Sequence, residues 1–221
     1  MIKLAIFDVD GTLVDSESVY LKAAIKNIKT HNYPVRMETI YKTFGATQAA
    51  IRKLISDDLG GDDKYDAYLS NLRKLMDDIY EKEPVKVKEG TFEILEYLKE
   101  NNVKIAIATS TYRDKQMPVL EKTGLLKYID SMVFGDEIKN SKPAPDIYLK
   151  TMEYYNFQKE EALIFEDSIN GILSGYNAGI KVIGIPDQVA IPKDVQDKTY
   201  AMCNNLIEAI DITKKLLWVN P

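Results

Sequence analysis

The apolar residues of the chain gather in short runs, and helical periodicity appears between them. Five runs predict short buried strands, which span residues 3–7, 103–108, 131–134, 162–165 and 181–185. Between the later runs, apolar residues recur instead at the spacing of a helix. Strands that alternate with helices predict an α/β fold, in which helices cover both faces of a five-stranded parallel sheet.

Two of the predicted helices also show where they begin or end. Tyr148, Met152 and Tyr155 lie at i, i+4 and i+7, and Pro145 before them suits the first turn of a helix. A second helix is expected to end at Gly179, because glycine adopts the left-handed conformation of a C-terminal cap. The apolar stripe of this helix consists of Ile169, Ile172, Leu173 and Tyr176.

The long gap between the first two strands breaks the alternation. Residues 15–84 show no strand pattern, only amphipathic helical stripes with charged residues on the opposite faces. We therefore expect an α/β core domain formed by residues 1–14 and 85–221, and a helical cap domain formed by residues 15–84. The insert leaves and re-enters the sheet near its carboxyl edge, which makes it a candidate lid, and its short connections could act as hinges. The stripes are Leu21, Ala24, Ile25 and Ile28; Ile51, Leu54, Ile55 and Leu59; and Tyr65, Tyr68, Leu69, Leu72, Met76 and Ile79.

Composition limits the possible classes of function. The formal net charge of −5 and the lack of a basic block argue against nucleic acid as a partner. No apolar run approaches the roughly 18 residues that span a membrane. Cys203 is the only cysteine, which excludes an internal disulfide and favours the cytoplasm. Because His31 is the only histidine, catalysis has to rest mainly on carboxylates, lysine and hydroxyls. A monomer is the default expectation.

Asp8 and Asp10 are the most informative residues of the sequence. They follow the first apolar run directly and precede Gly11, which indicates a strand that ends in two carboxylates and then turns. Binding sites in open α/β sheets lie at the carboxyl ends of the strands. Two carboxylates so close together perturb each other's protonation and need a cation or a shared proton.

Three further strands are followed by polar groups that suit the same edge. The second strand leads into Thr109, Ser110 and Thr111, whose hydroxyls could bind a phosphate oxygen, although such residues also cap helices. Lys142 follows the third strand in a segment that is stiffened by Pro143 and Pro145, and Glu166 and Asp167 end the fourth. Taken alone, each signal has an ordinary structural explanation, such as a surface lysine or an acidic helix start. Their coincidence with the first pair of carboxylates favours a functional site.

Together these groups suit phosphoryl transfer. The carboxylates provide oxygen ligands for a hard cation such as Mg2+. A carboxylate can attack phosphorus to form an acyl phosphate, while a lysine and a cation offset charge on the phosphoryl oxygens. A second carboxylic acid can protonate the leaving group and then deprotonate water. No glycine-rich Walker sequence is present, which argues against ATP-driven chemistry.

In these four motifs and their order, the chain resembles the haloacid dehalogenase superfamily, and within it the capped phosphatases and β-phosphoglucomutase-like enzymes. The resemblance covers essentially the whole chain. It implies a Rossmann-like sheet of order 5-4-1-2-3, which would bring the four motifs together. It also implies that Asp8 is the nucleophile, Asp10 the general acid/base, Thr109 a phosphate-binding hydroxyl and Lys142 the charge-stabilising lysine.

The same resemblance implies a magnesium site. Asp8, the main-chain carbonyl of Asp10 and Asp167 would bind the metal, and Glu166 would be either a further ligand or a group behind the ligands. An acid at position 10 supports phosphate-ester chemistry, because dehalogenases that resemble this fold lack it. The expected enzyme is therefore a Mg2+-dependent phosphatase that acts on a small phosphorylated metabolite, such as a sugar phosphate, through a phosphoaspartate.

A mutase of the β-phosphoglucomutase type is the main alternative. A mutase needs a second cationic phosphate site, but Gln48 stands where mutases carry an arginine, and Tyr20 stands where they carry a hinge histidine. The charge could still come from Arg52, Arg73, Lys74 or Arg113. A metal-dependent phosphate sensor without catalysis is a remote alternative. The expected substrate-binding residues are Gly45, Thr47, Gln48, Arg52, Ser110 and Arg113.

Overall fold

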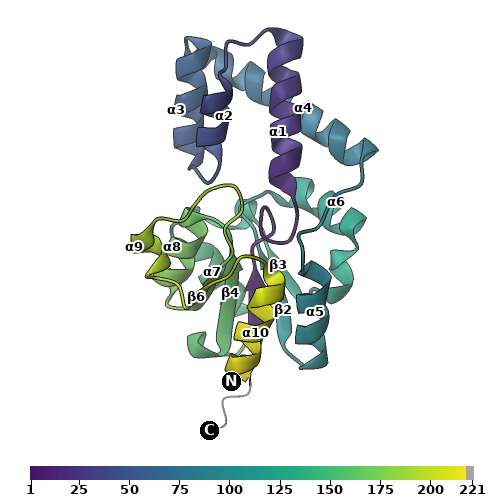
Figure 1. Ribbon diagram of the computed structural model, residues 1–221, viewed down its shortest axis with the longest axis vertical. Coiled ribbons are helices and arrows are strands. Elements are labelled where there is room, and N and C mark those ends of the chain that lie inside the picture. Colours follow the sequence, from purple (N-terminus) through teal and green to yellow (C-terminus); the bar gives the residue numbers. More distant parts are fainter. Residues whose placement is uncertain (218–221) are drawn as a thin grey trace. The chain divides into compact units, whose positions relative to one another are not determined.

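The computed structural model describes residues 1–217, and the chain divides into two compact units. One unit comprises Met1–Val14 and Lys86–Pro221, and the other comprises Asp15–Val85. The first is built on a sheet and is called the core unit here. The second consists of helices and is called the helical unit (Figure 1).

The sheet of the core unit contains six parallel strands in the order β3-β2-β1-β4-β5-β6. The strand order 5-4-1-2-3 expected for the first five is confirmed. The sixth strand was not predicted, because two residues are too few to show a period of two. The strands are β1 (Leu4–Phe7), β2 (Lys104–Ala108), β3 (Ser131–Val133), β4 (Ala162–Glu166), β5 (Lys181–Gly184) and β6 (Ala201–Met202).

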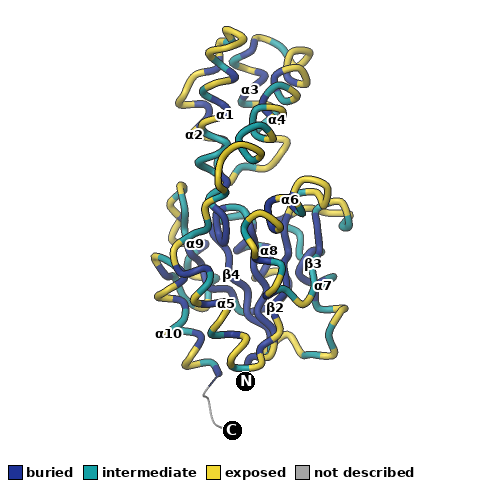
Figure 2. Tube along the Cα trace, turned by 90° about the vertical axis from the view of Figure 1, so that its right-hand side faces the viewer, coloured by how far each residue is buried: buried dark blue, intermediate teal, exposed yellow. Residues whose placement is uncertain are grey.

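Helices cover both faces of this sheet (Figures 1 and 2). On one face α7 packs against α8, and on the other α5 packs against α10. This arrangement buries the strands from both sides, as the continuous apolar runs predict. The helices of the core unit are α5 (Thr91–Glu100), α6 (Arg113–Thr123), α7 (Asp146–Glu153), α8 (Ile169–Ala178), α9 (Lys193–Gln196) and α10 (Leu206–Leu217).

The central strand β1 is buried along its whole length. Successive side chains of a strand point to opposite faces, so Leu4 and Ile6 join the apolar cluster that includes Ile147 and Ile172 of the helices. The ring of Phe7 stacks on that of Phe165, with 4.3 Å between the ring centres. The two strands whose ends carry Asp8 and Asp167 are thus held rigidly side by side.

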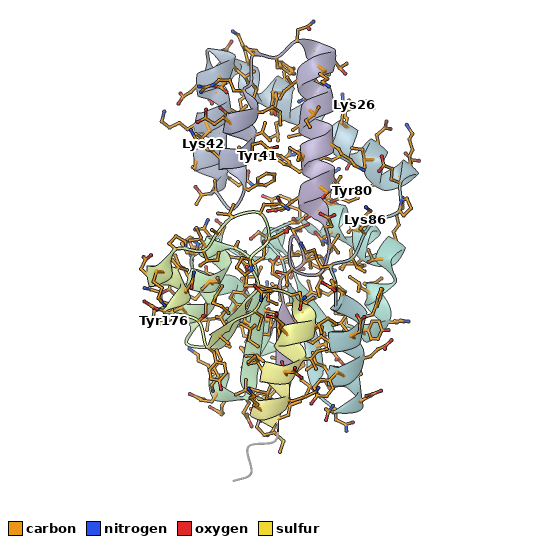
Figure 3. The ribbon with its side chains drawn as sticks, in the orientation of Figure 1. Lys26, Tyr41, Lys42, Tyr80, Lys86 and Tyr176 are labelled. Atoms are coloured by element: carbon orange, nitrogen blue, oxygen red, sulfur yellow. The ribbon has the colours of Figure 1, made fainter. Side chains whose placement is uncertain are left out.

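The helix predicted to end at Gly179 does so, and this glycine has a φ of 75°. The predicted apolar stripe is wrong at Tyr176, whose side chain lies on the outer surface and is about half exposed (Figure 3). The physical reason is close packing, because a Cβ at Gly175 would lie 2.5 Å from Val182 of β5. Small residues bring α8 onto the sheet, and the large aromatic ring remains outside, with the ammonium of Lys198 5.7 Å from its centre.

The preceding helix, α7, is shorter than its stripe predicts. It starts directly after Pro145 and ends at Glu153, so Tyr155 lies beyond it. Tyr155 still packs against the core, and its hydroxyl forms a 2.7 Å hydrogen bond with Ser131. Tyr148 is completely buried, as the stripe predicts.

The helical unit confirms the absence of strands between residues 15 and 84. Its interior combines apolar side chains with tyrosines, and the amide of Asn27 donates to the main-chain carbonyl of Tyr68 at 3.0 Å. The helices are α1 (Ser16–His31), α2 (Met37–Thr43), α3 (Gln48–Leu59) and α4 (Tyr65–Lys82). None of the helices in the described part of the chain is long and apolar enough to cross a membrane.

An ion pair joins two helices of this unit. Arg36, at the start of α2, donates its main-chain N–H and its guanidinium to Asp58 of α3 at 2.6 to 2.9 Å. Burial acts to raise the pKa of Asp58, but the hydrogen bonds from Arg36 and Thr39 outweigh it and hold the pKa at about 2. Because the folded-state pKa lies below the unfolded value, this carboxylate stabilises the fold above about pH 4 and loses that effect as the pH falls towards 2.

We therefore predict that Asp58→Asn lowers the free energy of unfolding at pH 7 by roughly 1 to 2 kcal/mol, an amount reduced by the exposure of Arg36. Urea unfolding followed by circular dichroism should show the difference from the parent protein shrinking between pH 4 and pH 2. The neighbouring Asp57→Asn is the control, because its 2.8 Å pair with Lys53 is exposed on both sides and contributes little. Equal effects of the two substitutions at pH 7 would contradict the prediction.

Candidate active site

The carboxyl edge of the sheet brings the predicted core residues together. Asp8 follows β1, Thr109 follows the neighbouring β2, and Asp167 follows β4 on the other side. Two ladder hydrogen bonds continue past the strand ends, from the N–H of Asp8 to Phe165 and from that of Thr109 to Val133. The side chains at this edge are consequently carried by backbone that belongs to the sheet.

Lys142 is the centre of the site. Its side chain is buried, and its ammonium donates to Asp8 Oδ1 at 2.5 Å, to Glu166 Oε1 at 2.6 Å and to the carbonyl of Ala108 at 3.2 Å. An ammonium has three protons, so all three are used. The loop after β3 therefore delivers the lysine to the predicted nucleophile, as the sequence suggested.

Glu166 is completely buried and surrounded by donors. In addition to the lysine, Tyr148 donates its hydroxyl to Oε1 at 2.8 Å, and Ser168 donates its N–H and hydroxyl to Oε2 at 3.1 Å. Gly171 leaves the room that this carboxylate occupies, since a Cβ there would lie 1.8 Å from Oε1. Glu166 thus balances the charge of Lys142 and holds it in place.

Asp10 receives hydroxyl groups from the loop after β2. Thr111 donates to its Oδ2 at 2.7 Å, and Thr109 lies 3.4 Å from the same oxygen. The main-chain N–H of Thr111 also donates to the hydroxyl of Thr109 at 3.1 Å. Sequence reasoning included Thr111 in the run of hydroxyl residues after this strand, but it did not predict the contact with Asp10.

Asp167 lies beside the turn that follows β1. The hydroxyl of Thr12 donates to its Oδ1 at 3.1 Å. Gly11 has a φ of 87°, and a Cβ there would lie 2.3 Å from Oδ2, so this position needs glycine for two reasons. Asp8, Glu166 and Asp167 can each present one oxygen within 4.8 Å of the others. This buried acidic group is consistent with a metal site.

The site carries more negative than positive charge. The acidic group has three buried carboxylates, and one ammonium, that of Lys142, contacts two of them. Burial raises the pKa of Asp8 to about 8, against the effect of Lys142, and the nearby Glu166 and Asp10 add to the rise. Although burial acts to lower the pKa of Lys142, the two carboxylates that it contacts hold it well above the ordinary value. A cation would relieve this imbalance and favour ionised Asp8.

The two expected substrate-binding residues of the core unit differ in whether their side chains already have partners: Ser110 is exposed, and Arg113 is paired. Ser110 is exposed at the edge of the sheet, next to Thr109. Arg113 is already engaged, because its guanidinium donates to Glu137 at 2.5 Å and lies 4.3 Å from the centre of the Phe134 ring. This pairing gives Arg113 a structural role and leaves substrate binding by it a prediction.

The other expected substrate-binding residues belong to the helical unit. The guanidinium of Arg52 donates to Asp62 and Asp66 at 2.7 to 2.9 Å and lies over the ring of Tyr65, so its charge is balanced within that unit. Thr47 caps α3 by accepting from the N–H of Ala50. Gln48 is exposed, and Gly45 adopts a φ of 66° in the turn before it. Substrate contacts by these residues remain predictions.

Comparison with known proteins identifies the family. A family model described as haloacid dehalogenase-like hydrolase matches residues 5–185. The chain belongs to this family. The resemblance inferred from the four motifs is therefore confirmed, and so is the expectation of a phosphatase of this family.

Relatives of the haloacid dehalogenase-like family cover most of the chain. A phosphorylated carbohydrates phosphatase from Thermotoga maritima is 32% identical, over 80% of this chain and 82% of its own. A phosphoglycolate phosphatase from Aquifex aeolicus is 28% identical over 95% of this chain and 97% of its own length. A crystal structure of a Thermotoga maritima protein, provisionally described as a β-phosphoglucomutase, is 28% identical, covers 97% of this chain and 99% of its own, and superposes with a TM-score of 0.81.

We predict that Tyr148→Phe lowers turnover of an aryl phosphate about tenfold. The substitution removes only the hydroxyl that shares Glu166 Oε1 with Lys142, and a hydrogen bond to a charged group contributes about 1.5 to 3 kcal/mol. Steady-state kinetics with p-nitrophenyl phosphate would measure the loss.

The chain offers a matched control for this substitution. Tyr128 donates to Glu96 at 2.8 Å, the same length as the bond from Tyr148, but in another part of the core unit. Tyr128→Phe should leave turnover within about twofold of the parent protein. Similar losses in both variants would mean that the effect is one of general stability and not of the site.

Proposed function

We propose that the protein is a Mg2+-dependent phosphatase that hydrolyses a small phosphomonoester, a sugar phosphate or a similar metabolite, through a phosphoaspartate on Asp8. The observation that carries the proposal is the buried contact of 2.5 Å between Asp8 and Lys142, with a second acid, Asp10, held two residues away by threonine hydroxyls. A nucleophile, a cationic partner and an acid/base are the parts that this chemistry needs.

In the first step, a carboxylate oxygen of Asp8 attacks phosphorus, and the bond between phosphorus and the ester oxygen breaks. Asp10 donates a proton to the departing ester oxygen, which leaves as an alcohol. Lys142 stabilises charge on the phosphoryl oxygens, and the hydroxyl of Thr109 is available to bind one of them. The products of this step are the free alcohol and phosphorylated Asp8.

In the second step, water replaces the alcohol. The carboxylate of Asp10 accepts a proton from the water molecule as its oxygen attacks phosphorus. The bond between phosphorus and Asp8 breaks, and inorganic phosphate is released. Asp10 has then regained the proton that it lost, and Asp8 is ready for another cycle.

The donor set fits a hard divalent cation. Asp8, Asp167 and Glu166 offer carboxylate oxygens within 4.8 Å of one another, in a buried site with excess negative charge. Magnesium prefers such oxygen ligands and accepts one or two carboxylates together with phosphate. When bound, it would neutralise phosphoryl charge next to the nucleophile. Because Glu166 already accepts hydrogen bonds at both oxygens, Asp8 and Asp167 are the better candidates for direct contact.

The substrate class rests on the relatives. They act on phosphorylated carbohydrates, phosphoglycolate and validoxylamine A 7'-phosphate, which are all small phosphorylated metabolites. The helical unit would serve as the cap that closes over such a substrate, with Gly45 to Arg52 as the region of specificity. A cytoplasmic monomer remains our expectation, and sedimentation of the purified protein would test the monomer.

A mutase of the β-phosphoglucomutase type is the second candidate, and the similar Thermotoga maritima crystal structure is the observation that favours it. A mutase must hold a second phosphate with a cationic group. The pairing of Arg52 with Asp62 and Asp66 weighs against this role, and Gln48 supplies no charge. We therefore prefer the phosphatase.

Asp8→Asn should lower the rate of phosphate release at least about a thousandfold, because the amide cannot attack phosphorus. The variant should still fold. Purified protein with Mg2+ would be offered a panel of sugar phosphates, including β-glucose 1-phosphate with a trace of its bisphosphate. Released phosphate and glucose 6-phosphate would be measured separately. Formation of glucose 6-phosphate without net phosphate release would mean a mutase, and full activity of the variant would exclude the phosphoaspartate.

Mg2+ should raise the melting temperature of the parent protein, because the cation binds the folded site and relieves its charge. Asp167→Asn should weaken this shift strongly, whereas Asp187→Asn, an acid paired with Lys88 in the same unit, should preserve it. Thermal unfolding without substrate, over a series of Mg2+ concentrations, measures the effect independently of activity. An identical shift in both variants would refute the assigned metal site.

A further inference from the structure

The carboxylate of Asp10 accepts hydrogen bonds from the side chains of two threonines, Thr109 and Thr111. Thr111 provides the shorter of these contacts, 2.7 Å from its hydroxyl to Asp10 Oδ2. We propose that Thr111 is a positioning residue, which orients Asp10 for proton transfer to the leaving group. The inference rests on the proposed function, because it assumes that Asp10 is the general acid.

The backbone that carries Thr111 is anchored on both sides. The N–H of Thr111 donates to the hydroxyl of Thr109, and its carbonyl accepts from the N–H of Gly135 at 3.1 Å. A Cβ at Gly135 would lie 2.0 Å from the carbonyl oxygen of Ser110, so the two loops touch along their main chains. A hydroxyl on such a backbone can fix the orientation of a partner.

Asp10 itself lies in the turn after β1, where its orientation has to be set by neighbours. The hydroxyls of Thr111 and Thr109 both donate to its Oδ2. A threonine hydroxyl that donates to one carboxyl oxygen leaves the other, Oδ1, for exchange of the proton with the substrate. Small errors in the placement of a catalytic group cost rate steeply, so loss of this hydroxyl should reduce acid catalysis and leave binding unchanged.

Leaving-group dependence separates this role from a structural one. An alkyl phosphate needs proton donation because an alkoxide is a poor leaving group, whereas p-nitrophenolate departs without it. kcat/KM reports the steps up to release of the alcohol or phenol. A defect in the acid should therefore lower kcat/KM for the alkyl phosphate selectively, and a damaged fold should lower both values.

The experiment compares kcat/KM for p-nitrophenyl phosphate and for the preferred alkyl phosphate of the substrate panel, at saturating Mg2+. We expect Thr111→Val to lower the alkyl value about tenfold and the aryl value less than about twofold. Thr111→Ser, which keeps the hydroxyl, should restore the alkyl value to within about threefold. Should the valine variant fail to fold, Thr111→Ala replaces it.

Two reference variants complete the test. Asp10→Asn should also lower kcat/KM for the alkyl phosphate more than for p-nitrophenyl phosphate, and its effect should be larger than that of Thr111→Val. Thr213→Val removes a buried hydroxyl that donates to Ala209 at 2.7 Å in α10, and it should change neither value. If Asp10→Asn lowers both values equally, the acid role in the proposed function fails, and the inference with it. If Asp10→Asn is selective but Thr111→Val is not, or if serine does not restore activity, only the role of Thr111 is refuted.

Discussion

The buried ammonium of Lys142 is the interaction on which the rest of the site depends. It touches two carboxylates from different strands, Asp8 and Glu166, in a region that excludes water. Removing the ammonium would leave both buried carboxylates without their counter-charge, which is costly. The hydroxyls of Tyr148 and Ser168 complete the set of donors around Glu166. The lysine is thereby fixed next to Asp8 before any substrate binds.

This arrangement requires the strand order of the sheet. β1 lies between β2 and β4, so the residues after these three strands meet although more than a hundred positions separate some of them. The close approach also depends on two glycines. Gly11 makes room for Asp167, and Gly171 makes room for Glu166. Hydrophobic burial holds the strands together, and the glycines allow the acidic groups to converge at their ends.

The charges of the helical unit have a different function from those of the core site. Arg36 pairs with Asp58, and Arg52 pairs with Asp62 and Asp66, so both guanidinium groups stabilise contacts between segments of that unit. A phosphate that bound there would have to compete with carboxylates for these arginines. In the core site, by contrast, negative charge exceeds positive charge, and a divalent cation would restore the balance.

The sequence by itself determined the parallel sheet and, through the family resemblance, the order of its five main strands. It also predicted a helical insert and the candidate site residues Asp8, Asp10, Thr109, Lys142, Glu166 and Asp167. These signals are local, because a short apolar run and the polar residue that follows it are adjacent in the chain. Only the tertiary structure showed that Thr111 contacts Asp10, that Tyr148 contacts Glu166, and that Arg52 and Arg113 are already paired. It also showed that the side chain of Tyr176 lies on the surface and that the sheet has a sixth strand, β6. Such outcomes depend on which side chains from distant segments compete for the same space and the same hydrogen bonds, and neither periodicity nor spacing records that competition.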